Sequence, residues 1–129
     1  MKHLIKLLFL FAIPAMAQTA IVFTWTNGNT GSSAYPACTS TVTKSCVTGF
    51  TLMMDGSTTV AGPSSIGPTL TTYTQTPLPA VGTHSYVLTM NGFDGVGNAI
   101  VSVGSNMVSV TVPAPVTLNP PTGFKAVIQ

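Results

Sequence analysis

The sequence predicts an all-β protein built as a sandwich of antiparallel sheets. Short runs in which apolar and polar residues alternate, such as AIVFTWT and THSYVLTM, are typical of strands that bury one face. Gly and Pro are spread along the chain and divide these runs, and long stretches with helical periodicity are not found. These observations favour short strands joined by turns.

The first residues predict a secretory signal peptide, residues 1–17. Lys2 and Lys6 form a short basic region, and residues 7–13 are an apolar run too short to span a bilayer. A proline then breaks the run, and small residues lead to a cleavage site after Ala17. A short core helix is the alternative for this segment. Export would place the rest of the chain in the periplasm or the extracellular space.

Cleavage would leave a chain with almost no charge. Two of the four lysines depart with the signal, and two lysines then face two aspartates. Such a surface has no electrostatic footprint for nucleic acid or for anionic lipid. No later segment is apolar enough over sufficient length to cross a membrane. A neutral surface rich in Thr, Ser, Asn and Gly suits extracellular packing, fibres, contact with carbohydrate or a plain secreted domain.

Cys38 and Cys46 are the two cysteines of the chain, and a metal clip, a redox pair and a disulfide are the candidate roles. Zinc needs about four ligands, and His84 is the one histidine that remains after cleavage. Redox pairs normally have the spacing Cys-x-x-Cys. Because exported cysteines usually pair, we expect a disulfide that stabilises the fold by roughly 2–3 kcal/mol. Two free buried thiols are the alternative, and we expect no metal and no cofactor.

Five alternating runs supply the candidate strands of residues 18–113. They are AIVFTWT, CVTGFTLMM, TLTTYTQT, THSYVLTMNGF and AIVSVGSNMVSVTV, the last with a break at Gly104-Ser105. The expected inward faces carry Ile21, Phe23, Trp25; Phe50, Leu52, Met54; Tyr86, Leu88, Met90; and Val108, Val110, Val112. Asp55-Gly56 and DGVGN predict turns. Pro63 and Pro68 make the stretch between them and the preceding turn an edge or a loop.

The order of these runs resembles a fibronectin type III domain or a related bacterial immunoglobulin-like domain. Trp25 stands where the second strand of that family carries its core tryptophan. VTGFTLMMDG resembles the third strand, TTYTQTPLPAVGTHSYVLTMNGFDGVGN the E strand through the F–G turn, and SNMVSVTVP the last strand. The resemblance covers about residues 20–113 and implies an immunoglobulin-like antiparallel β-sandwich. The corner tyrosine of the family falls on His84 or Tyr86.

The first strand of the family is not seen before the tryptophan strand, because the expected mature chain starts at Gln18. A strand-like pattern instead follows in the tail, residues 114–129, where Phe124, Ala126 and Ile128 alternate with other residues after a Pro-Pro pair. The tail is interpretable as the start of a second domain, a linker or an irregular edge in the same molecule. It is also interpretable as a strand donated to the next molecule in a head-to-tail homo-oligomer.

The sequence does not favour catalysis. Asp55 and Asp94 stand in Asp-Gly turns, which explain them through backbone conformation, and His84 has no evident acidic partner. No serine has a nucleophile-elbow context. We expect Met53, Met54, Met90 and Met107 to pack in the core or on strand faces.

Two classes of function remain. The first is a secreted structural, adhesion or protein-interaction module, with fibre assembly by the tail as one form of it. The second is a small carbohydrate- or ligand-binding module that uses the polar loop 29–45, which the disulfide staples, with Tyr35 at its tip. A staple equally restrains a long loop against proteolysis.

Overall fold

The structure, a computed structural model, describes residues 18–28, 35–39, 44–115 and 122. Within these ranges it contains strands and turns and no helix, as the sequence predicts. The strands are β1 (Ile21–Thr24), β2 (Cys46–Met54), β3 (Thr58–Ala61), β4 (Thr72–Gln75), β5 (Gly82–Phe93), β6 (Ala99–Val101) and β7 (Val108–Val112).

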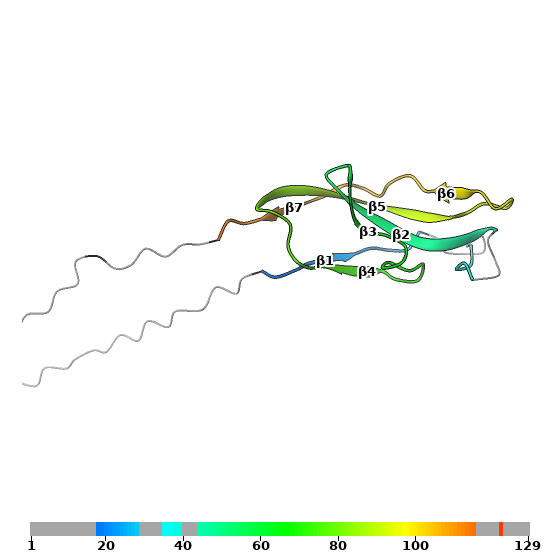
Figure 1. Cartoon of the computed structure of the whole chain (residues 1–129), viewed down its shortest axis with the longest axis horizontal. Helices are drawn as coiled ribbons and strands as arrows, with labels where there is room; N and C mark the ends of the chain where they lie inside the picture. The colour runs from blue at the N-terminus through cyan, green and yellow to red at the C-terminus, as the bar shows by residue number, and fades with distance from the viewer. Residues whose placement is uncertain (1–17, 29–34, 40–43, 116–121, 123–129) are drawn as a thin grey trace, which may run out of the picture.

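The strands form two antiparallel sheets that lie over one another (Figure 1). The smaller sheet pairs β1 with β4. The larger sheet has the order β3–β2–β5, and β6 and β7 follow each other along the outer edge of β5. β7 pairs with Gly82–Tyr86 and β6 with Asn91–Phe93. The all-β class is confirmed, and the arrangement is consistent with a sandwich.

The core lies between the sheets because each sheet turns alternate apolar residues inward. Phe50 and Leu52 are each 3% exposed and Tyr86 is 2% exposed. The ring of Phe23 lies 4.7 Å from that of Tyr86, and Trp25 meets Phe50 edge-on at 5.5 Å, centroid to centroid. Each fully buried Leu or Phe contributes about 1.5–3 kcal/mol. The inward faces predicted for β1, β2 and β5 are confirmed, whereas Val108, predicted to face inward on β7, is 46% exposed.

Both predicted Asp-Gly turns are present. Asp55 and Gly56 have φ angles of 52° and 77°, which is the backbone of a tight hairpin turn between β2 and β3. In the second turn, Asp94 Oδ1 accepts the N–H groups of Val96 at 2.9 Å and Asn98 at 2.8 Å. These bonds hold the pKa of Asp94 below its usual value, with the Asn98 backbone as the largest cause.

The stretch that the sequence marks as an edge or a loop contains both. β3 is an edge strand, and the loop after it sends Ile66 fully into the core with 0% exposure. Phe50 N–H donates to the Ile66 carbonyl oxygen at 2.8 Å. Gly49 has a φ of 144°, and a Cβ there would collide with that same oxygen. The glycine therefore lets the loop close over β2.

Between β6 and β7, serine hydroxyls replace strand carbonyls. The N–H of Met90 donates to Ser102 Oγ at 2.9 Å, and that of Leu88 donates to Ser105 Oγ at 3.0 Å. The predicted break is therefore wider than one Gly-Ser pair. Met107 is 66% exposed and lies before β7, so the prediction that it packs in the core or on a strand face is wrong.

Several predictions fall on residues outside those that the structure describes. These are the candidate assembly strand of Phe124, Ala126 and Ile128, the signal peptide, and the loop residues 29–34 and 40–43.

Replacing Gly49 by Ala should lower the free energy of unfolding by about 3 kcal/mol, since the new Cβ meets backbone at a positive φ. Gly62→Ala is the matched control, because a Cβ there meets nothing within 4 Å. Its effect should stay within about 1 kcal/mol. Urea unfolding measures both, and equal effects of the two variants would contradict this account of Gly49.

Candidate functional site

One edge of β1 carries backbone groups that face no strand among the described residues. Trp25 N–H donates to the Thr71 carbonyl oxygen at 3.0 Å, in register with the β1–β4 pairs. In an antiparallel pair, alternate residues point their N–H and C=O groups at the partner. Those of Phe23 therefore point at β4, and those of Val22 and Thr24 point to the other side. Among the described residues, β1 pairs with β4 alone.

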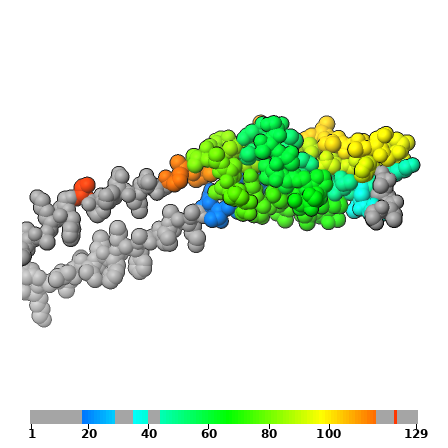
Figure 2. Space-filling view, viewed as in Figure 1, coloured from blue at the N-terminus to red at the C-terminus, as the bar shows by residue number. Residues whose placement is uncertain are grey.

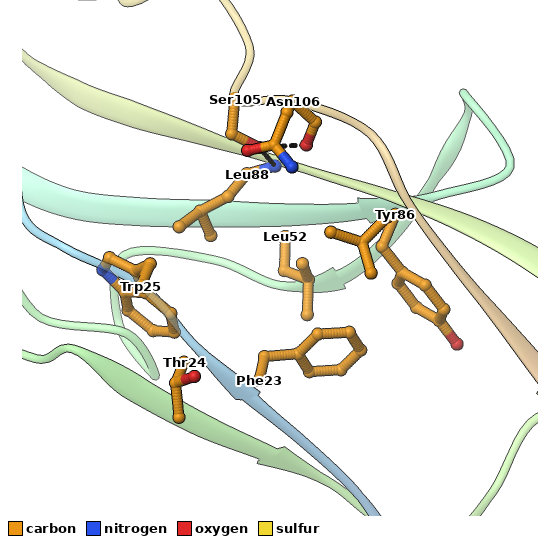
Figure 3. A pocket seen from close by; sticks show the side chains of 9 residues that line it. Phe23, Thr24, Trp25, Leu52, Tyr86, Leu88, Ser105 and Asn106 are labelled. Carbon is orange, nitrogen blue, oxygen red and sulfur yellow. Dashed lines mark hydrogen bonds between the residues drawn. The ribbon is translucent and has the colours of Figure 1, made fainter.

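A groove runs along this open edge, and we call it the β1 groove. It has a volume of about 680 Å³. One wall is the chain from Thr24 to Gly28, the other is Ser102–Asn106 with Val108, and Phe50 and Leu88 lie at its base. Figure 3 shows the side chains of Leu88 and its neighbours projecting into the space between β1 and the opposite wall.

The β1 groove reaches the core at Phe50. A smaller hollow beside it shares Trp25 and Leu88 with the groove and is also lined by the core side chains of Phe23, Leu52 and Tyr86. No Asp, Glu, Lys or Arg is among the residues that line either one. The buried Nε1–H of Trp25, at the edge of the groove, has no hydrogen-bond partner among the described residues, which costs about 1–3 kcal/mol. The core is thus incompletely covered along β1.

Two of the residues that line the β1 groove are apolar and exposed. Val103 is 93% exposed and Val108 is 46% exposed. Exposed apolar side chains beside a groove are typical of sites that bind another protein.

The predicted disulfide between Cys38 and Cys46 is present. It fastens residues 35–39 beside the start of β2, where Cys38 N–H donates to the Val47 carbonyl oxygen at 2.9 Å. In return, Val47 N–H donates to the Pro36 carbonyl oxygen at 2.8 Å. The bridge therefore holds this segment to the larger sheet.

Tyr35, the predicted ligand residue, is 53% exposed. It lines an apolar hollow of about 210 Å³ together with Val47, Met90, Phe93 and Ile100. Tyr35 therefore lies beside a small hollow that β5 and β6 partly line.

The prediction that His84 has no acidic partner is wrong. Its Nδ1 lies 2.8 Å from Asp55 Oδ2, and its Nε2 lies 2.8 Å from the Ala80 carbonyl oxygen. Both neighbours are acceptors, so the ring donates from both nitrogens in its protonated form. The bond to Asp55, then that to Ala80, raises the pKa of His84. The bond to His84 is the largest cause of the lowered pKa of Asp55.

This pair joins the β2–β3 turn to the start of β5. A general base needs a free ring nitrogen to take a proton from a nucleophile. Here Nε2 is engaged by Ala80, and the Ser85 hydroxyl donates to Asp55 at 3.3 Å rather than to the ring. The geometry is that of a structural link between the β2–β3 turn and β5.

No known family model, curated protein or solved structure matches this chain. In the part of the chain that the structure describes, no group of three or more His, Cys, Asp or Glu side chains is placed to hold a metal ion. The same part of the chain contains no helix that is long and apolar enough to cross a bilayer. The β1 groove therefore stands on its geometry alone.

Sequence reasoning chose the stapled loop and the C-terminal tail as its candidate sites and did not foresee the β1 groove. The signal that pointed toward it was the expectation that a first strand is missing beside the Trp25 strand. The walls of the groove come from segments far apart in the chain, and the sequence placed Ser102–Asn106 in a strand run without indicating which strand lies beside it.

The pH dependence of stability should report the His84–Asp55 pair. The pKa of His84 is raised above its usual 6.5, so its contribution is full below that pH and is lost as pH rises through the folded-state pKa. The pKa of Asp55 is lowered below 3.8, so its contribution is full above that pH and is lost as pH falls through the folded-state pKa. The pair therefore stabilises the fold most between pH 3.8 and pH 6.5.

We expect the free energy of unfolding, measured with urea, to fall as pH rises from about 6.5 through the raised folded-state pKa of His84. Asp55→Asn should abolish this fall, and Asp94→Asn, the control, should retain it. An unchanged slope in Asp55→Asn, or a His84 ring that titrates below its usual pKa by NMR, would count against the pair.

Proposed function

We propose that the chain is an exported, non-catalytic β-sandwich module with a structural, adhesion or protein-interaction role, and that its β1 groove takes up a β-strand from a protein partner. One observation carries this proposal. An edge of β1 that pairs with no strand among the described residues lies beside an apolar groove open to the core. An added strand would meet hydrogen-bonding groups on one side and apolar side chains beneath it.

The strand order supports a fibronectin type III-like or immunoglobulin-like fold. In such sandwiches the second strand pairs with the fifth, and the third, sixth and seventh form the opposing sheet. β1 pairs with β4, while β2, β5 and β7 lie in the other sheet. With Trp25 at its end, β1 corresponds to the second strand. The place of the first strand is then the open side of β1.

Export is supported by the Cys38–Cys46 disulfide, because disulfides persist in oxidising compartments. The signal-like residues 1–17 point the same way, toward the periplasm or the extracellular space. The hydrogen bonds of His84 support a non-catalytic role, because Asp55 and Ala80 engage both of its ring nitrogens.

Strand addition draws its affinity from main-chain hydrogen bonds and its specificity from alternate side chains in pockets. The groove supplies both, through Val22 and Thr24 on β1 and through Phe50 and Leu88 at its base. Because no charged side chain lines it, the partner strand should be apolar on its inner face.

Binding of a carbohydrate or another small ligand by the stapled segment is the alternative, favoured by the exposed ring of Tyr35 beside its hollow. At about 210 Å³ the hollow is smaller than the roughly 300–1,000 Å³ of ordinary ligand pockets. Binding on a glycan array that is lost in Tyr35→Ala would favour this alternative, and no binding by either protein would remove it.

The single tryptophan of the chain, Trp25, reports on the groove. A panel of strand-forming peptides with Phe, Val or Ile at alternate positions should shift Trp25 emission to shorter wavelength, at dilutions where light scattering shows monomers. Val103→Asp places a charge on the wall of the groove formed by Ser102–Asn106. It should weaken binding of these peptides at least about tenfold.

Val96→Asp is the matched control for this experiment. Val96 is also exposed, at 72%, but lies in the β5–β6 turn away from the groove. This variant should bind as the unmodified protein does. Emission that no peptide shifts, or equal losses in both variants, would refute strand uptake by the groove.

A further inference from the structure

We infer that the strand which fills the β1 groove is the C-terminal segment of a second copy of this chain, residues 120–129, running antiparallel to β1. This inference rests on the proposed function, because it names the partner of the same groove. The residue pattern of the segment, the direction in which the chain leaves the fold and the chemistry of the groove support it.

The residue pattern of the segment fits the groove. Phe124, Ala126 and Ile128 alternate with Lys125 and Val127. In a strand, successive side chains point to opposite faces, so the three apolar residues would face the base of the groove and Lys125 would face solvent. Ten residues of strand extend about 33 Å, more than enough to cover the four residues of β1.

The direction of the chain also fits. β1 begins and β7 ends at the same end of the molecule (Figures 1 and 2). The two strands therefore run in opposite directions. A chain that continues past Pro115 along the direction of β7 moves away from its own fold. On a second copy placed end to end, it runs antiparallel to that copy's β1, as an added strand in an antiparallel sheet should.

Filling the groove of the same molecule would require the chain to reverse. The segment would then run parallel to β1, a pairing that is slightly less stable for each residue. Pro113 and Pro115 oppose a tight reversal directly after β7, because proline fixes its own φ and biases the preceding residue toward extended backbone. The donated arrangement needs no such reversal.

Each copy would thus give one strand and accept one strand. The donated segment and the groove are different surfaces, so the contact is head-to-tail and does not close on itself. Repetition of this contact builds a filament of copies.

Cross-linking between two cysteine variants tests the inference. Val22 is 63% exposed on the outer side of β1, and Val127 would lie on the same outer side of the added strand. The full-length proteins carrying Val22→Cys and Val127→Cys are exported, purified separately, mixed and treated with a short bismaleimide, which joins free thiols. We expect a covalent dimer on a denaturing gel.

Two controls accompany this measurement. Thr59→Cys carries its thiol at an exposed position of β3, in the other sheet, and should give no dimer with Val127→Cys. Adding Phe124→Asp to Val127→Cys should reduce the dimer at least about tenfold, because a charge would enter the apolar base. A variant that carries both Val22→Cys and Val127→Cys in one chain should give a ladder of covalent multimers.

Cross-linking within one chain, or equal dimer yield with Thr59→Cys, would overturn the inference. Trp25 emission then separates the two proposals. A shift with panel peptides but not with a peptide of residues 120–129 would reject the inference and leave strand uptake standing. No shift with any peptide would reject both.

Discussion

Aromatic packing between the two sheets is the interaction on which the rest of the structure depends. Phe23 lies against Tyr86, and Trp25 lies against Phe50. Because β1 and β4 form a sheet of their own, these side-chain contacts hold the smaller sheet over the larger one. They also decide where the core ends. Beyond the outer edge of β1, Leu88 and its neighbours remain open to the β1 groove.

An unpaired edge over an open core is a liability for a protein that works alone. Natural edge strands are protected by charged side chains, prolines, bulges or short length. β1 and β3 both have four residues and no charged side chain, but β3 is followed by Pro63 two residues after its end, whereas β1 is followed by no proline before Pro36. This contrast between the two edges favours a β1 edge that is kept for a partner strand.

Features that depend on one strand or one turn were predictable from the sequence. Alternation placed Phe50 on an inward face, Asp55-Gly56 marked a hairpin turn, and the expectation of export predicted that the cysteines pair. Ile66 was missed because it lies in a Gly-, Pro- and Ser-rich loop with no periodic pattern. The bond between His84 and Asp55 was missed because it joins residues 29 positions apart. Periodicity indicates which face of a strand is buried but not which strands lie side by side. The β1 groove could therefore be recognised only from the sheet topology.

Amide hydrogen exchange along β1 tests the central claim most directly, because one strand carries both the probe and its control. The N–H groups of Phe23 and Trp25 point at β4, and those of Val22 and Thr24 point into the open side. We predict that Val22 and Thr24 exchange slowly when the protein is concentrated and assembled, and rapidly when it is diluted to monomers. Rapid exchange at both concentrations, or slow exchange in the monomer, would contradict a groove that is filled by a second molecule.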